Sequence, residues 1–310
     1  MHGDRDCQRQ PDPLQKAARL LRCRMRSTVR ILFATVVILS LTACSRVELA
    51  YENADWFGAW RIAGSLDLNR SQRLWLRDEL TAYRAFHRQQ RLPELIVTLD
   101  DADALLRDPT ADADAVNALL GRVEQILRRT ATDLIPLTAA VLRDLDAAQR
   151  AALADTLQEG RTRYVDERLV DQTERAIERT EHWTGPLAAD QLTAMAACVG
   201  ELPAISDTWE AWRLDVEEAL LALLEDAPGQ DAVEAFLQRW WLDEEARPMA
   251  LRDYRETSRR LWQHCSADLL VTLTAEQRDQ ALARLARYRA AVSALAARDT
   301  EPVAFPEPGR

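Results

Sequence analysis

The sequence predicts an all-α protein, and three observations support this fold class. Strong helix formers, above all alanine, leucine, arginine and glutamate, dominate the composition, whereas the 310 residues contain only 9 glycines. After residue 44 we find no alternation of apolar and polar residues that would indicate a half-buried strand. A helix-start pattern with the same spacing recurs along the chain. Together these features predict an elongated multi-helix bundle.

The chain begins with a segment that predicts export. An apolar run from Ile31 to Leu41 follows a stretch rich in arginine and is too short to cross a bilayer, because a spanning helix needs about 20 apolar residues. A basic region, a short apolar run and small residues before a cleavage site are typical of a secretory signal peptide. We therefore interpret residues 1–43 as a leader and signal peptide.

Residues 41–44, Leu-Thr-Ala-Cys, resemble the bacterial lipobox. The resemblance implies that the sulfur of Cys44 receives a diacylglyceryl group and that the chain is cut before this residue, leaving 267 residues. The alternative is an uncleaved N-terminal anchor. Residues 1–24 are unusually long for the start of a signal peptide, so we hypothesise that Met25 is the true start.

The composition after the signal peptide is acidic. Residues 1–44 hold eight basic and three acidic side chains, so the remainder of the chain carries a net charge of −15. Such a chain is a poor candidate for binding nucleic acid or anionic lipid through bulk charge. Lys16 is the only lysine, which excludes lysine nucleophiles and Schiff-base chemistry from the exported part.

The segment 44–65 follows the predicted anchor. Ser45 resembles the residue found after the lipidated cysteine in lipoproteins of the outer membrane, where aspartate is the usual signal for retention at the inner membrane. We therefore expect the periplasmic face of the outer membrane, with the inner membrane as the alternative. Tyr51, Trp56 and Trp60 either lie at the lipid interface, where amphipathic aromatic residues are favoured, or pack onto the domain. We favour packing.

The rest of the chain is predicted to form a series of helices. Leu76, Leu80, Tyr83 and Phe86 recur near the helical period and predict a helix at 70–90. Proline at a first-turn position, capping residues and Gly-Pro breaks then predict helices at 93–106, 110–142 with Thr110 as its cap, 146–182, 189–201, 207–225, 230–242, 248–271 and 275–296. The charged stretch 161–179 is expected to be a solvated connector. The proline-rich end, 299–310, is expected to be a disordered tail.

Three of these helices begin with a capping box that a leucine precedes. In a capping box the cap side chain accepts the third amide of the helix, and a glutamine there reaches back to the cap amide. The cap and glutamine pairs are Asn69 and Gln72, Asp146 and Gln149, and Thr274 and Gln277. Leu187 and Gln191 keep the same spacing without the cap residue.

A second similarity predicts an internal duplication. Residues 114–122 resemble 231–239, and each segment lies about 40 residues after one of the glutamines. We therefore divide the folded part into two related helical halves, 66–184 and 185–298, with the connector helix in the first.

The start of the exported chain, with Tyr51-Glu52-Asn53, the box at 66–73 and Phe86-His87-Arg88, is similar to a domain-of-unknown-function family of proteobacterial lipoproteins. This resemblance implies a lipid anchor and a helical periplasmic body. It implies no activity.

No motif for a particular chemistry is present. His87, His182 and His264 are isolated in the sequence, and neither metal-binding spacings nor nucleotide-binding glycine patterns occur. We therefore predict no catalytic residue, no metal site and no cofactor. An enzyme is the third interpretation, after a binding protein and a carrier.

Cys198 and Cys265 are the two cysteines of the folded part. They either form a disulfide, as is common outside the cytoplasm, or are buried as small apolar residues. The second half also holds Trp209, Trp212, Trp240, Trp241 and Trp262. Tryptophan with arginine is typical both of interface hot spots and of large helical cores, and we favour the core.

The sequence therefore predicts a membrane-anchored lipoprotein that binds or scaffolds a protein partner at the cell envelope. The alternative is a carrier for an apolar ligand held between the halves. A carrier requires a sizeable apolar cavity, a scaffold an exposed patch of tryptophan and arginine, and an enzyme a cleft with convergent polar groups.

Overall fold

The computed structural model describes residues 47–169, 172–202 and 206–298. Over these residues the chain forms helices and no strand, which confirms the all-α multi-helix fold. Residues 47–52 are helical. The helices that follow are α2 (Ala54–Ser65), α3 (Arg70–Gln90), α4 (Leu92–Arg107), α5 (Ala113–Arg143), α6 (Ala147–Leu169), α7 (Gln172–Thr184), α8 (Ala189–Gly200), α9 (Ser206–Glu225), α10 (Gln230–Leu242), α11 (Met249–Thr272) and α12 (Ala275–Ala296). The predictions for Cys44, Ser45, Met25 and the tail at 299–310 lie outside the described residues.

Most predicted helices agree closely with the observed ones. α2 was not predicted, the helix predicted at 146–182 covers both α6 and α7, and one cap is wrong. Thr110 does not cap α5, because its amide and hydroxyl donate to the Asp108 carboxylate at 2.8 and 2.7 Å. The cap is Asp112, whose Oδ1 accepts the Ala115 amide at 2.9 Å. Aspartate is favoured both at helix caps and in turns. Here Asp108 stabilises the turn before α5, and Asp112 caps the helix.

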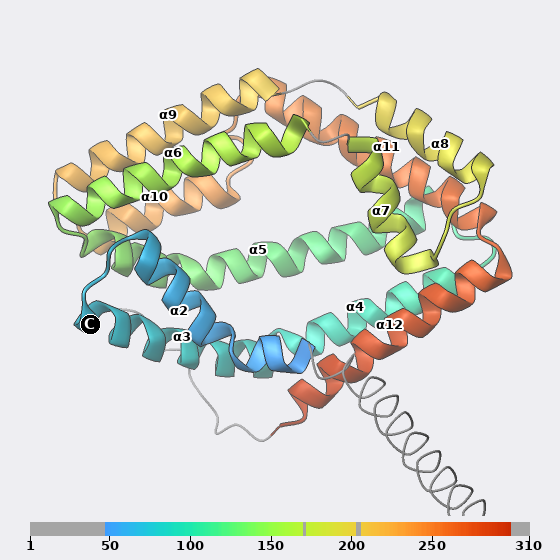
Figure 1. Ribbon diagram of the computed structural model, residues 1–310, viewed down its shortest axis with the longest axis horizontal. Coiled ribbons are helices and arrows are strands. Elements are labelled where there is room, and N and C mark those ends of the chain that lie inside the picture. The colour runs from blue at the N-terminus through green and yellow to red at the C-terminus, as the bar shows by residue number, and fades with distance from the viewer. Residues whose placement is uncertain (1–46, 170–171, 203–205, 299–310) are drawn as a thin grey trace, which may run out of the picture.

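The helices lie around an oval (Figure 1). α6, α9 and α10 form one end of it, α7, α8 and α11 the other, and α5 runs along its length. The main core lies where α5 meets α10, and it holds Ile135 and Leu137 of α5 with Val233 and Leu237 of α10. A smaller cluster joins α4 to α12 around Leu92, Val292 and Leu295.

The capping boxes are present at α3, α6 and α12. At α8 the amide of Ala188 donates to Gln191 Oε1 at 2.9 Å, so the glutamine half of the box is kept without a cap side chain. The preceding leucines are all buried: Leu68, Leu145, Leu187 and Leu273. The four glutamines then meet in pairs, Gln72 with Gln149 and Gln191 with Gln277.

Helix packing repeats in the same order along the chain. α2 packs on α3 as α7 packs on α8, and α4 packs on α12 as α9 packs on α6. The long helix α5 would then correspond to α10 and α11 together, which the turn at 243–248 separates. These pairings support the proposal of two related halves. They favour halves that begin one helix earlier, at α2 and at α7, so that α7 opens the second half.

Candidate functional site

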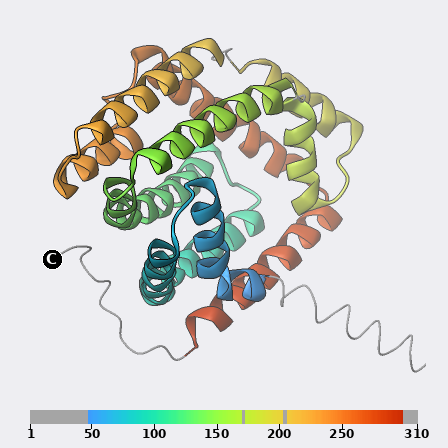
Figure 2. The same cartoon turned by 60° about the vertical axis from the view of Figure 1, so that its left-hand side comes forward.

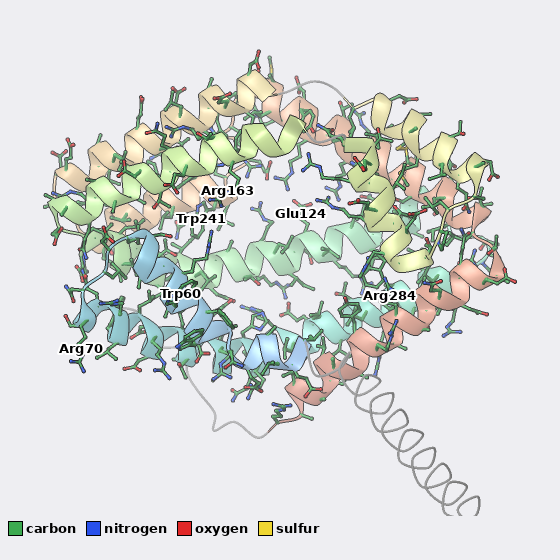
Figure 3. The ribbon with its side chains drawn as sticks, in the orientation of Figure 1. Trp60, Arg70, Glu124, Arg163, Trp241 and Arg284 are labelled. Atoms are coloured by element: carbon green, nitrogen blue, oxygen red, sulfur yellow. A yellow bond between two sulfur atoms is a disulfide. The ribbon has the colours of Figure 1, made fainter. Side chains whose placement is uncertain are left out.

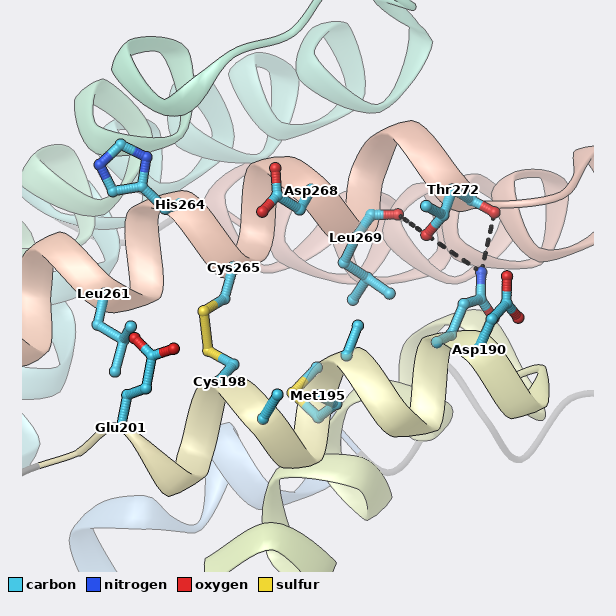
Figure 4. Close-up of a pocket in the computed structure, with 13 residues that line it drawn as sticks. Asp190, Met195, Cys198, Glu201, Leu261, His264, Cys265, Asp268, Leu269 and Thr272 are labelled. Atoms are coloured by element: carbon cyan, nitrogen blue, oxygen red, sulfur yellow. Dashed lines mark hydrogen bonds between the residues drawn. A yellow bond between two sulfur atoms is a disulfide. The ribbon is translucent and has the colours of Figure 1, made fainter.

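Cys198 of α8 and Cys265 of α11 lie side by side and are joined by a disulfide, with Cα atoms 6.1 Å apart (Figure 4). The bond closes a loop of 66 intervening residues, because the two cysteines are 67 positions apart. Both cysteines line a groove of about 500 Å³ between the two helices.

The α8–α11 groove has an apolar floor and scattered polar groups. Ala194, Met195, Leu261 and Leu269 supply apolar surface beside the disulfide. His264 and Asp268 project from one edge of α11, whereas Glu201 extends from α8 (Figure 4). The polar side chains of this groove therefore do not converge on one point, as a catalytic site would require. Over the described residues no group of three or more His, Cys, Asp or Glu is placed to hold a metal ion.

A second groove, of about 470 Å³, lies between α9 and α11 and collects tryptophan and arginine. We call it the tryptophan–arginine groove, and its lining residues are Trp209, Trp212, Arg247, Leu251, Tyr254, Arg255, Ser258, Arg259 and Trp262. Those on α11 follow the spacing of a single helix face, so one stripe of this helix faces the groove. Two groove tryptophans contact guanidinium groups: that of Arg247, which also lines the groove, lies 5.8 Å from the Trp212 ring, and that of Arg213, one turn along α9, lies 5.0 Å from the Trp209 ring.

Four arginines share two glutamates beside this groove. Glu124 on α5 faces α11 and accepts from Arg255 at 2.5 Å, with Arg259 at 3.6 Å (Figure 3). Glu244 pairs with Arg247 at 3.2 Å, with Arg128 at 3.6 Å, and also with Arg255. This cluster therefore carries two positive charges in excess, although the chain as a whole has a net charge of −10.

Two donors at the groove have no partner among the described residues. The Nε of Arg247 and the hydroxyl of Ser258 are both buried and without a hydrogen bond. Burial lowers the pKa of Arg247; the Glu244 carboxylate opposes this shift, and Arg255 and Arg128 add to it. A ligand that brings carboxylate oxygens would satisfy such donors and reduce the repulsion among the arginines.

The five tryptophans that follow residue 185 are all half-buried, so the core interpretation is only partly correct. Trp240 and Trp241 pack against the main core. Trp209, Trp212 and Trp262 line the groove instead.

A third cluster joins the start of the described chain to α3. The hydroxyl of Tyr51 lies 3.2 Å from the carbonyl oxygen of Arg84 and 3.1 Å from Nδ1 of His87. Burial raises the pKa of Tyr51 to about 12. Burial also lowers the pKa of His87, so this ring favours its neutral form.

Glu52 accepts from three arginines, Arg84 at 2.5 Å and Arg88 and Arg298 at 2.7 Å. Burial alone would raise the pKa of this carboxyl, but the bond and charge of Arg88 and the charges of Arg84 and Arg298 hold it below its usual value. Arg298 also pairs with Glu48 at 2.5 Å. The helical segment 47–52 is thus fixed to α3 and to the residues that follow α12.

Packing is the correct interpretation for Tyr51 but wrong for two neighbouring rings. Trp56 is 48% exposed and Trp60 is 65% exposed. The sequence indicated aromatic residues near the predicted anchor, but it did not show which of them face solvent. Among the helices that the structure describes, none combines the length and apolar character needed to cross a bilayer.

These features define a class: an all-α protein with a disulfide in its second half and a tryptophan–arginine groove. The chain belongs to a family of unknown function, DUF6279, whose model matches residues 64–255. The match extends from the end of α2 into α11. No curated protein and no solved structure matches the chain.

Proposed function

We propose that this protein is a lipid-anchored binding protein of the bacterial cell envelope, which holds a protein partner in its tryptophan–arginine groove. The observation that carries the proposal is the groove itself, since the few residues that dominate binding at protein interfaces are enriched in tryptophan, tyrosine and arginine. A lipid on Cys44 anchors the chain, at the periplasmic face of the outer membrane or, as the alternative, at the inner membrane.

The groove favours a partner segment that carries carboxylates. Its arginines outnumber the glutamates that pair with them, and Arg247 and Ser258 retain buried donors. The aromatic rings supply apolar contact area, and the arginines supply orientation through paired hydrogen bonds.

In vivo photo-crosslinking tests the proposal. A photoreactive amino acid replaces Tyr254, which lines the groove, or Tyr288, a half-buried tyrosine of α12 that packs on Trp183 and serves as the matched control. We expect a discrete adduct from position 254, none from 288, and loss of the adduct when Arg259→Glu reverses a groove charge. An adduct of equal yield from both positions, or one that survives Arg259→Glu, contradicts the binding site.

The anchor is tested separately on the same cells. Palmitate labelling and membrane fractionation are compared between the wild-type chain and Cys44→Ala. We expect the label and the membrane association to be lost in the variant. Equal labelling of both chains would refute the lipid anchor and leave the groove experiment to stand alone.

One observation favours a second function, that of a carrier for an apolar ligand. The α8–α11 groove has an apolar floor of Ala194, Met195, Leu261 and Leu269, and it lies within the second half rather than between the halves. A carrier should release lipid into organic extracts of the purified protein, and Met195→Asp should abolish this release.

A further inference from the structure

The helix that follows the predicted anchor carries an apolar stripe on its outer side. Leu49, Trp56, Phe57 and Trp60 are 66%, 48%, 55% and 65% exposed. Leu49 lies on the helical segment 47–52 just before α2, and the other three residues share one face of α2. We call the four residues together the α2 aromatic face. The rings of Trp56 and Trp60 stack with centroids 6.5 Å apart. In Figure 2, α2 lies at the front of the molecule with no helix covering it on that side.

The fold does not require these rings. α2 packs on α3 through small residues, because Ala59 and Ala63 are buried and Gly58 lies against the Leu80 side chain. Trp56, Phe57 and Trp60 project beside this packing stripe, and each ring stays about half exposed or more. The aromatic face therefore contributes little to the core.

The corresponding helix in the second half differs. α7 packs on α8 as α2 packs on α3, but its exposed residues are mostly polar: Gln172, Glu174, Glu178, Arg179, His182 and Trp183. Trp183 in turn packs on Tyr288, with ring centroids 5.4 Å apart. An exposed aromatic stripe is thus specific to the helix beside the predicted anchor.

The charges around α2 are also unequal. Its acidic neighbours are engaged: Glu48 and Glu52 pair with Arg298, and Asp55 lies 3.4 Å from Arg84. The exposed arginines form no ion pair within the described part of the chain: Arg61, Arg70, Arg73 and Arg77. Asp67 and Asp78 are the exposed acidic residues in the same stretch, 61–78. Its exposed side chains therefore carry two positive charges in excess, within an acidic protein.

The aromatic face is held close to Cys44. Five positions separate this cysteine from Leu49, and an extended chain of that length spans at most about 18 Å. The helical segment 47–52 is fixed through Tyr51, Glu52 and Arg298, so the direction of α2 relative to the body is set. Exposed, apolar and adjacent to the membrane, these rings would contact lipid whenever the anchor is inserted.

We propose that the α2 aromatic face inserts into the lipid–water interface beside the anchor and thereby fixes the orientation of the domain on the membrane. This inference rests on the proposed function, because the proposed lipid on Cys44 is what brings the domain to a membrane. Tryptophan prefers this interface because its ring is apolar and its N–H still reaches water. The neighbouring arginines meet lipid phosphates locally, so the acidic net charge of the whole chain does not oppose binding. The tryptophan–arginine groove then presents a defined direction to its partner.

An environment-sensitive fluorophore tests the insertion. The purified lipoprotein is labelled at Phe57→Cys, or at Val271→Cys as a matched control, since Val271 is 67% exposed on α11. Each sample is reconstituted into vesicles of phosphatidylethanolamine and phosphatidylglycerol that contain a spin-labelled lipid. We expect a blue shift and quenching at position 57 and neither at 271. Emission at 57 equal to that at 271 overturns the inference.

A second measurement separates this inference from the anchor. The chain from Ser45 onward, which lacks the lipid, is sedimented with the same vesicles. We expect binding that Trp56→Ser with Trp60→Ser abolishes and that Trp183→Ser leaves unchanged. If palmitate labelling fails but this pattern holds, the anchor is wrong and the lipid-binding face stands. If the double variant binds as the parent does, or if it only converts a dimer into a monomer, the face does not bind lipid.

Discussion

The side-chain amides of Gln72 and Gln149 hydrogen-bond to each other in both directions, with Nε2 to Oε1 distances of 3.1 and 2.7 Å. Each glutamine also donates to the backbone just before the other's cap, Gln72 to Asp144 at 3.2 Å and Gln149 to Asp67 at 3.2 Å. The starts of α3 and α6 are thus joined by the same side chains that cap them.

The second half repeats the arrangement with different neighbours. Gln191 and Gln277 exchange hydrogen bonds at 3.0 and 2.9 Å and donate to the carbonyl oxygens of Thr272 and Pro186. In all four cases the accepting carbonyl lies two residues before the partner's cap. A shared pattern of this detail favours an origin by duplication over two independent solutions.

The first prediction concerns this pair. Gln149→Ala removes both hydrogen bonds between the two glutamines and takes away the partner of the Asp67 carbonyl and of the Asp146 amide. Water does not readily replace these bonds, because Gln149 is only 4% exposed. An unsatisfied buried polar group costs about 1–3 kcal/mol, so the free energy of unfolding should fall by about this amount. Urea denaturation measures it, with Gln158→Ala as the control on an exposed position of α6. Equal midpoints for the two variants would contradict a structural role for the pair.

These glutamines show how much of the fold could be predicted from the sequence. The recurring spacing of leucine and glutamine predicted the helix starts, because capping is a local interaction within a few residues. The pairing joins residues 77 and 86 positions apart, and no local rule encodes which helix starts meet. The duplicated spacing was the available signal, since similar helix starts in two halves are expected to find similar partners.

The second prediction concerns Glu217, which is 1% exposed on α9. Its carboxylate accepts from Arg213 at 2.6 Å and also pairs with Arg161 of α6. Glu217→Ala leaves the arginines uncompensated and should lower the free energy of unfolding by about 3–5 kcal/mol. Glu217→Met should cost less than Glu217→Ala, because it fills the space. Glu218→Ala, on an exposed neighbour, is the control, and an equal loss there would refute the argument.

Glu217 also shows why the prediction of a solvated helix at 161–179 is wrong for its first residue, Arg161. Helical spacing and alternating charge predicted a solvated face, yet Arg161 reaches a buried carboxylate. The partner lies 56 positions away on another helix, so the pattern around Arg161 does not reveal it. The same limit applied to the tryptophan–arginine groove: the stripe on α11 could be found by its period, but not the α9 tryptophans that face it.

The third prediction concerns the disulfide between Cys198 and Cys265. Closing a loop of this length restricts the unfolded chain and adds about 4 kcal/mol in the chain-entropy model. Replacing both cysteines by alanine should therefore lower the free energy of unfolding by up to about this amount. The native protein should show no thiol at these positions until it is reduced. Two alkylatable thiols in the native protein, or equal stability with and without reductant, would show that the bond does not persist in solution.

The last prediction is a loss of stability on mild acidification that depends on His87. Burial lowers the pKa of this ring, Asp133 opposes that shift and Arg91 adds to it, while the Tyr51 hydroxyl contacts Nδ1. In the unfolded chain the ring returns to a pKa of about 6.5, so below that pH the unfolded state binds a proton that the folded state resists. Stability contributed by the neutral ring is therefore complete above about pH 6.5 and is lost as pH falls toward the lower folded-state pKa.

His87→Gln should have a lower free energy of unfolding at neutral pH. Its free energy of unfolding should also change less with pH between about pH 7 and pH 5, before carboxylates titrate. Unfolding in urea across this range measures both slopes, and His264→Gln on α11 is the control. Parallel profiles for wild type and His87→Gln would mean that the proton binds elsewhere.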